Sequence, residues 1–221
     1  MDIFQTVILA FIQGLTEFLP VSSSAHLVIF PKFFDWPDQG LAFDVVLHFA
    51  SLCAVIIYYR ASIVLLTQDF FSSISKRKMQ GDSVLAWGVL LGTIPVGLAG
   101  LFFNDYVEMN LRSFEVVAYA TIFFGLVLGL SDLVHRVRGI NREVIGGSDI
   151  LIVGCAQALA LIPGTSRAGI TITAALLIGL SIKLSIKFAF LLSIPVISVA
   201  TLLKPVSYTH LRAHETRGNL V

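Results

Sequence analysis

A series of long apolar runs, each close to the length of a membrane-crossing helix, limits the folds that this chain can adopt. Three of them are uninterrupted and bounded by charged or polar residues, at 41–59, 84–103 and 116–134. A bilayer core takes about 20 consecutive apolar residues in helical form. Charged residues make up only 13% of the 221 residues, against roughly 25% in soluble domains. We therefore predict an all-α polytopic membrane protein.

The positive charges that flank these runs predict how the chain is threaded. Basic residues follow the first and third runs: Lys76, Arg77, Lys78, Arg136, Arg138 and Arg142. Because cytoplasmic loops carry an excess of Lys and Arg, we expect 60–82 and 135–147 in the cytoplasm and 104–115 outside. The formal net charge of +1 leaves no basic excess for a phosphate backbone, so we expect no nucleic-acid partner.

Two further apolar regions, 3–34 and 148–180, are broken in the middle and resemble each other. Residues 18–29 (FLPVSSSAHLVI) align with 161–172 (LIPGTSRAGITI) with four identities in twelve positions, and a one-residue gap also aligns Gln13 with Gln157. Three spans separate the copies, so the second copy is expected to be inverted across the membrane. Inverted repeats with broken, re-entrant helices meet near the midplane. The alternative is that two proline-kinked apolar helices look alike by chance, because apolar segments use few residue types.

This pattern predicts one membrane domain over 1–204, with repeat 1 at about 1–115 and repeat 2 at about 146–204. Only one span, 188–203, follows the second broken region, so we expect repeat 2 to be incomplete by two helices. We expect the chain to be poorly stable and weakly active or inactive. Residues 205–221 have no apolar period and look like translated sequencing-adapter sequence. We expect a non-native tail there and do not interpret His210 and His214 as a metal pair.

Ionisable residues at bilayer depth are costly, which makes each of them a functional candidate. They are Glu17, His26, Asp44, His48 and Arg167. Gln13 and Glu17, spaced i and i+4, share a helical face and can offer oxygen ligands to a hard divalent cation; the alternative is that Glu17 bonds a neighbouring helix. We interpret His48 as structural and Asp44 as a solvated or capping carboxylate.

The two breaks also predict a phosphate site. Pro20 ends one half-helix, and the hydroxyls of residues 22–24 can cap the next. In the second copy, Pro163 and Gly164 make the break, Thr165 and Ser166 give the caps, and Arg167 stands in the first helical turn. Helix N-termini favour anions, and a guanidinium matches phosphate oxygens. The alternative is that Arg167 extends to a membrane surface.

His26 makes the two copies chemically different, because the second copy has Gly169 at the equivalent position. An imidazole beside a phosphate can act as base, acid or nucleophile. The alternative is a histidine that is hydrogen-bonded within the packing.

The segments QGLTEFLPVSSSAH (13–26) and PGTSRAGIT (163–171) resemble the two signature regions of the undecaprenyl-pyrophosphate phosphatase family, the bacitracin-resistance membrane proteins. The resemblance covers 1–204. The chain departs from the family at Ala168, where serine is usual, and we expect it to lack the family's remaining C-terminal helices. The resemblance implies hydrolysis of undecaprenyl pyrophosphate to undecaprenyl phosphate and orthophosphate in the bacterial plasma membrane. It further implies a site that opens outward and a divalent cation, Mg²⁺ or Ca²⁺.

The resemblance also implies roles for individual residues. The catalytic candidates are Glu17, His26, Ser166 and Arg167, and Glu17 and Gln13 are the candidate metal ligands. The substrate-binding candidates are Gln13, Ser23, Gly164, Thr165, Arg167 and Thr171. Whether His26 activates water, or His26 or Ser166 attacks phosphorus, stays open.

Two other interpretations of the same pattern compete with the hydrolase. A secondary transporter or lipid flippase would also use inverted repeats with broken helices, and an inactive fragment is the third. The expected partners are the polyprenyl pyrophosphate and membrane lipids, with a homo-oligomer left open.

Overall fold

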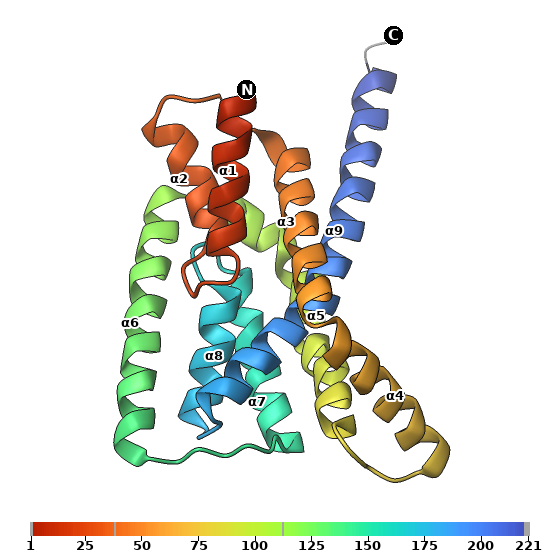
Figure 1. The fold of residues 1–221 in the computed structure, drawn as a ribbon. Helices are drawn as coiled ribbons and strands as arrows, with labels where there is room; N and C mark the ends of the chain where they lie inside the picture. Colours follow the sequence, from red (N-terminus) through yellow and green to blue (C-terminus); the bar gives the residue numbers. More distant parts are fainter. Residues whose placement is uncertain (1, 38, 112, 219–221) are drawn as a thin grey trace.

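The computed structural model describes residues 2–37, 39–111 and 113–218. Its regular elements are helices, arranged as an elongated bundle in Figure 1. In chain order they are α1 (Ile3–Thr16), α2 (Ser23–Phe33), α3 (Gly40–Tyr58), α4 (Arg60–Lys76), α5 (Ser83–Asn110), α6 (Phe114–Arg138), α7 (Gly147–Ala158), the 3₁₀ turn η1 (Leu159–Leu161), α8 (Arg167–Leu177) and α9 (Ile182–Gly218). The predicted all-α class is confirmed.

Three of the described helices are long and apolar enough to cross a membrane. These candidate spans are Ser83–Phe103 in α5, Phe114–Arg138 in α6 and Ile182–Thr201 in α9. α3 and α4 pass the same test together, although the chain bends by 75° between them. The predicted runs at 84–103, 116–134 and 188–203 are therefore helical, and the chain is a multi-pass membrane protein.

Helix α4 was not predicted, and its sequence explains why. Its apolar residues Ile63, Leu66 and Phe70 recur at helical spacing and pack against the main core. Between them lie polar residues such as Gln68 and Asp69, which leave no long apolar run. A search for uninterrupted spans therefore stops at Tyr59, whereas the amphipathic period continues to Lys76.

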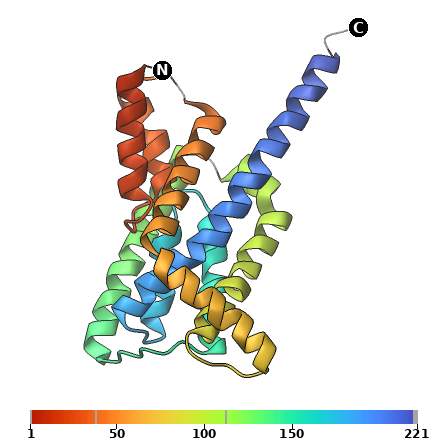
Figure 2. The ribbon, with the colours of Figure 1, turned by 45° about the vertical axis from the view of Figure 1, so that its right-hand side comes forward.

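The two broken regions form helical hairpins that approach each other from opposite ends of the bundle. Figures 1 and 2 show α1 and α2 at the end that carries the N-terminus, and α7 and α8 at the other end, with their turns facing each other at mid-height. The turns are residues 17–22 and 162–166. This placement is the one that inverted repeats require; the inverted relation of the complete repeats stays a prediction.

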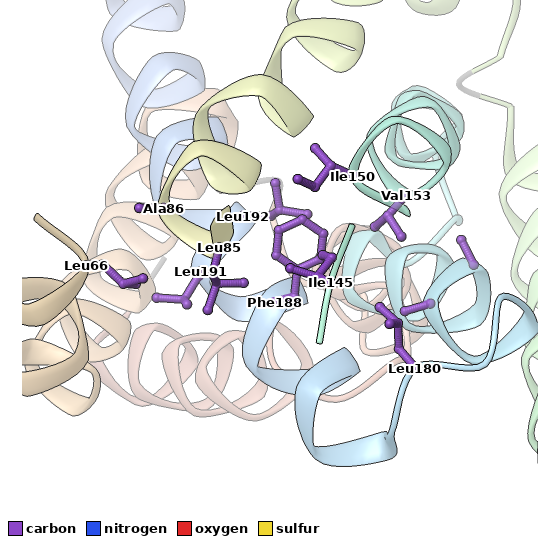
Figure 3. Close-up of a cluster of buried hydrophobic side chains, with 12 residues drawn as sticks. Leu66, Leu85, Ala86, Ile145, Ile150, Val153, Leu180, Phe188, Leu191 and Leu192 are labelled. Carbon is purple, nitrogen blue, oxygen red and sulfur yellow. The ribbon is translucent and has the colours of Figure 1, made fainter. Parts of the chain in front are cut away.

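The main core lies where α4, α5, α7, α8 and α9 converge. Figure 3 shows the ring of Phe188 between Leu192, Ile150 and Ile145, and Phe188 itself is fully buried. At the contact between α5 and α7, a Cβ on Gly154 would lie 2.8 Å from the carbonyl oxygen of Gly92. Small residues at this crossing let two membrane helices approach backbone to backbone.

Helix α9 is longer than the predicted span of 188–203, because it begins at Ile182 and continues to Gly218. No proline or glycine occurs between Val206 and Arg217 to end it. The boundary expected at Lys204 is thus not a helix end. That 205–221 is a non-native tail stays a prediction, and residues 219–221 lie outside the described part.

The connections predicted to share one side of the membrane lie at one end of the bundle. Figure 1 places the α4–α5 and α6–α7 connections at the end opposite the N-terminus, and the α5–α6 connection towards the other. The assignment of these ends to cytoplasm and exterior stays a prediction.

Candidate active site

The first break sets the position of Glu17. Glu17 follows the last residue of α1, and its backbone N–H still donates to the carbonyl of Gln13. After Pro20 the chain reverses, and Ser22 caps α2 by accepting the backbone N–H of Ala25 at 3.4 Å. The Glu17 carboxylate therefore lies at the C-terminal end of α1, beside the first turn of α2.

The second break depends on a glycine. Gly164 has φ of +94°, and a Cβ there would lie 2.3 Å from the carbonyl oxygen of Val117 on α6. The hydroxyl of Thr121 on α6 also donates to the Gly164 carbonyl at 3.0 Å. Only a residue without a side chain fits this conformation so close to another backbone. Gly164 thus shapes the turn that precedes Ser166 and Arg167.

The predicted cap at the start of α8 is confirmed. The Ser166 hydroxyl oxygen accepts the backbone N–H of Gly169 at 3.1 Å, and Arg167 is the first residue of the helix. A cation at a helix start is electrostatically unfavourable by itself. An anionic neighbour is therefore expected, and the structure supplies one.

A buried ion pair joins the two hairpins. The Arg167 Nη2 donates to the Glu17 Oε1 at 2.6 Å, and the side chains are 16% and 6% exposed, respectively. Arg167 Nη1 donates to the carbonyl of Ser193 on α9 at 3.3 Å. The guanidinium thus turns inward rather than to a membrane surface. Glu17 does bond a neighbouring helix, as the alternative interpretation proposed, and it does so while lining a cavity.

The second oxygen of Glu17 lies among three polar side chains. Gln13 Nε2 donates to Glu17 Oε2 at 3.0 Å and the Ser23 hydroxyl donates to it at 2.6 Å. His48 Nε2 lies 3.6 Å from the same oxygen. The predicted shared face of Gln13 and Glu17 is confirmed, and the carboxylate is oriented from α1, α2 and α3 at once.

Glu17, Ser23, His48 and Arg167 line a cavity of about 220 Å³, whereas Gln13 does not line it. The first turns of α2 and α8 both contribute to its wall, as the sequence predicted for the two helix N-termini. Its lining residues are Thr16, Glu17, Ser22, Ser23, Ser24, Val45, His48, Ala160, Thr165, Ser166, Arg167, Ala168, Val196, Ile197, Ala200 and Thr201. Among these described residues, hydroxyls, a carboxylate, a guanidinium and the His48 imidazole therefore share the cavity with apolar residues of α3 and α9.

The other predicted site residues take different places. Thr165 lines the cavity, and its buried hydroxyl has no hydrogen-bond partner among the described residues. Thr171 does not line it; its hydroxyl donates to the carbonyls of Arg167 and Ala168 at 2.8 and 3.1 Å. Thr171 therefore supports the first turn of α8, and a direct contact with substrate stays a prediction.

His26 also lies outside the lining of this cavity. Its Nδ1 is 2.8 Å from the carbonyl oxygen of Ser22, and its ring stacks on Phe30. The structure thus shows the hydrogen-bonded packing that was its alternative interpretation, and a catalytic role for His26 stays a prediction. The imidazole that does face the cavity, His48, was interpreted from the sequence as structural. Only its ionisable character inside an apolar run could have indicated it.

The oxygen atoms near Glu17 suit a hard cation that binds together with substrate. The described residues contain no group of three His, Cys, Asp or Glu side chains placed to hold a metal. The Oε1 of Gln13 is buried and lacks a hydrogen-bond partner among those residues. Mg²⁺ is commonly bound by one or two carboxylates together with substrate phosphates. Glu17, which lines the cavity, fits that pattern; Gln13 does not line it, and its role as a metal ligand stays a prediction.

Comparison with known proteins gives consistent matches. A family described as "Bacitracin resistance protein BacA" matches residues 6–220. The undecaprenyl-diphosphatase of Ruthia magnifica subsp. Calyptogena magnifica is 57% identical over 210 residues, which cover 95% of this chain and 79% of that protein. Undecaprenyl-diphosphatase 2 of Stutzerimonas stutzeri is 55% identical over 203 residues, with 91% and 75% covered. The undecaprenyl-diphosphatase of Campylobacter concisus is 52% identical over 200 residues, with 90% and 75% covered.

Proposed function

The chain belongs to the bacitracin resistance protein BacA family, and we propose that it hydrolyses undecaprenyl pyrophosphate to undecaprenyl phosphate and orthophosphate. The observation that carries the proposal is the meeting of Arg167, at the start of α8, with Glu17 and Ser23 from the opposite hairpin. Hydrolysis would return the lipid carrier to cell-wall synthesis and account for bacitracin resistance in the family.

Arg167 and the two helix starts supply the phosphate clamp. The guanidinium presents donors in a fork that matches phosphate oxygens, and the helix starts add a partial positive charge. The unpartnered hydroxyl of Thr165 lies in the same wall and can donate to a phosphate oxygen. These donors would stabilise the negative charge that develops on the phosphoryl oxygens in the transition state.

Substrate binding then requires an exchange of partners. Arg167 Nη2 is paired with Glu17 Oε1 at 2.6 Å. A pyrophosphate must therefore compete with this carboxylate for the guanidinium. A buried carboxylate that loses its cation is costly unless another partner replaces it. A divalent cation that enters with the pyrophosphate would meet this need.

We propose that Glu17 holds that divalent cation, Mg²⁺ or Ca²⁺. Gln13, the other ligand expected from the sequence, does not line the cavity and would act by orienting Glu17. A bound cation supplies Lewis-acid stabilisation of charge on the phosphate oxygens. Gln13 also keeps Glu17 in place through its 3.0 Å hydrogen bond, and Ser23 holds the same oxygen from α2.

The attacking group is restricted by existing hydrogen bonds. The Ser166 oxygen already accepts the Gly169 N–H, so attack by Ser166 would break the cap of α8. His26 bonds the Ser22 carbonyl through Nδ1, which leaves Nε2 as the nitrogen able to take a proton from water. We therefore favour water over Ser166 as the attacking group; activation by His26 requires that substrate binding bring its Nε2 to the cavity, whose lining it does not join here.

The cavity would open to the outer face of the bacterial plasma membrane. Its wall includes the first half of α3 and residues 196–201 of α9, whereas the basic connections after α4 and α6 lie at the end opposite the N-terminus (Figure 1). If those connections are cytoplasmic, the cavity is reached from the outer half of the membrane.

Orthophosphate release from undecaprenyl pyrophosphate by the detergent-solubilised chain tests the proposal. We expect release that a chelator abolishes and added Mg²⁺ or Ca²⁺ restores. Glu17→Gln should remove it, whereas Arg136→Ala, at an exposed pair with Asp132, should not. Movement of the lipid across vesicle bilayers without phosphate release would support a flippase instead.

A further inference from the structure

Among the described residues that line the cavity, His48 is the one with an imidazole, and neither signature region contains it. It projects from α3 with its side chain 28% exposed, and its Nε2 lies 3.6 Å from Glu17 Oε2. The other carboxylate oxygen, Oε1, is taken by Arg167. Glu17 therefore turns one oxygen to the cation of α8 and the other to the imidazole of α3.

The hydrogen bond on the far side of the ring fixes which nitrogen is available. His48 Nδ1 lies 2.7 Å from the backbone carbonyl oxygen of Asp44. A carbonyl oxygen can only accept, so Nδ1 carries the proton and the Nε2 lone pair points to the cavity. Histidines that bind metals have this arrangement, because a backbone carbonyl or carboxylate orients the ring through its other nitrogen.

We propose that His48 Nε2, Glu17 Oε2 and the Ser23 hydroxyl form a three-sided metal site that pyrophosphate oxygens complete. Adjacent ligands each about 2.1 Å from an octahedral ion stand roughly 3.0 Å from each other. His48 Nε2 and Glu17 Oε2 are 3.6 Å apart, so a shift of several tenths of an ångström would bring both to an ion. Ser23 lies 2.6 Å from the same carboxylate oxygen, and rotation of its hydroxyl hydrogen would turn an oxygen lone pair to the ion.

The nitrogen ligand predicts which metals the site prefers. Oxygen ligands suit Mg²⁺, Ca²⁺ and Mn²⁺, whereas an imidazole nitrogen favours first-row transition metals over Ca²⁺, with Mn²⁺ the weakest binder of that series. The inference rests on the proposed function only for the presence of a metal, and it adds a ligand from an element, α3, that the signature regions do not include. Mn²⁺ should therefore bind more tightly than Ca²⁺.

Mn²⁺ is also a direct probe of the ligand, because it is paramagnetic. Pulsed electron paramagnetic resonance on the full chain in detergent, with Mn²⁺ and inorganic pyrophosphate, should show modulation from one coordinated imidazole nitrogen. We expect His48→Ala to remove this modulation and to weaken Mn²⁺ binding at least about tenfold, while Ca²⁺ binding changes less. His26→Gln is the matched control: its ring bonds a backbone carbonyl in the same way but does not line the cavity, so the nitrogen signal should persist.

Each outcome decides the proposal separately from the reaction. Thermal unfolding of each variant in detergent establishes that it is folded. A folded His48→Ala variant with parental Mn²⁺ affinity, or a parent that binds Mn²⁺ without a nitrogen signal or does not bind it, would overturn the site. A nitrogen signal that depends on His48 in a chain that releases no orthophosphate would support the site and contradict the proposed hydrolysis.

Discussion

At the scale of single residues, the structure is organised around one carboxylate. Glu17 is 6% exposed at its side chain and accepts from Arg167, Ser23 and Gln13. These partners come from three helices that start or end at mid-height of the bundle. A buried charge with this many donors is tolerated at bilayer depth, where an unpaired carboxylate is not. The residues that make the site are thus also those that hold the two hairpins together.

Arg167→Lys should fail to preserve activity although it preserves the charge. Lysine offers a point charge and cannot donate simultaneously, in a planar fork, to a phosphate and to the Ser193 carbonyl. We expect a loss of at least about 10²-fold in kcat, the scale of one oriented transition-state donor. Steady-state orthophosphate release measures it, and near-parental turnover would show that Arg167 is not the clamp.

The sequence predicted this residue set unevenly, for a physical reason. Glu17 and Arg167 lie beside proline breaks, and the duplication of the break is by itself enough to indicate a shared site. His48 lies in the middle of a regular apolar helix with no break or repeat beside it. Its closeness to Glu17 depends on how α3 packs against α1, which local spacing does not encode. His26, in contrast, was singled out by its motif and lies outside the cavity lining.

At the scale of elements, the close approach of α5 and α7 positions the second hairpin. Gly92 and Gly154 are in contact through their backbones, and the Gln157 side chain donates to the Gly92 carbonyl at 3.3 Å. In a bilayer, where apolar side chains gain little from leaving lipid, such close packing supplies much of the association energy.

Gly154→Ala should therefore destabilise the fold. The added Cβ would meet the Gly92 carbonyl oxygen at 2.8 Å and its Cα at 2.9 Å, and backbone atoms cannot turn aside as a side chain can. We expect a loss of about 1–3 kcal/mol, measured as unfolding free energy in mixed micelles. Gly129→Ala on α6, which meets nothing within 4 Å, is the control and should leave stability unchanged or slightly raised. Equal stability of both variants would contradict the predicted contact.

Hydrogen bonds from Arg142 stabilise the far end of the same hairpin. Arg142 donates to both carboxylate oxygens of Asp149 at 3.0 and 2.9 Å, and to the carbonyl of Ile178 at 2.8 Å. The start of α7 is thereby tied to the end of α8. Burial raises the pKa of Asp149, but hydrogen bonds from Arg142 and the Gly146 N–H outweigh it and hold the pKa below its usual value.

This shift predicts a pH dependence with a defined sign. Because the folded-state pKa of Asp149 is lowered, its stabilisation is present above the unfolded-state pKa and is lost as pH falls through the folded-state pKa. Asp149→Asn should cost about 1–3 kcal/mol near neutral pH and progressively less in acid. Thermal unfolding over a pH series measures the difference. Asp132→Asn removes a partly exposed pair with Arg136 and should have little effect at any pH. A pH-independent deficit in Asp149→Asn would contradict the role of the Asp149 carboxylate.

The helices themselves were predictable to different degrees. α5 and α6 were predictable, because a long apolar run with charged ends forms a spanning helix in a membrane and has few other structures open to it. α4 was not, because its single apolar face becomes recognisable only when the core it covers is known. The start of α9 at Ile182 was missed because Lys183 and Lys187 interrupt its first two turns. These lysines lie at the basic end of the bundle, where charge in a helix is inexpensive.

At the scale of the whole molecule, the charge distribution fixes a testable orientation. Cysteines introduced singly at Ser75 and Asn110, in a background without Cys53 and Cys155, report the two ends of the bundle. We expect a membrane-impermeant maleimide to label the Asn110 position in intact cells and the Ser75 position only after permeabilisation. The background without cysteines should remain unlabelled. Labelling of both positions from one side would overturn the threading and the outward opening of the cavity.

The ion pair between the hairpins has a consequence for how the chain is made. Glu17 and Arg167 are 150 residues apart, and a ribosome adding about 5–20 residues per second needs roughly 8–30 s to travel from one to the other. Throughout that time the first hairpin has no Arg167 to pair with, and an ionised carboxylate in lipid is costly. Glu17 must therefore stay in contact with water until then, and the first hairpin reaches its final depth only after the second has been synthesised.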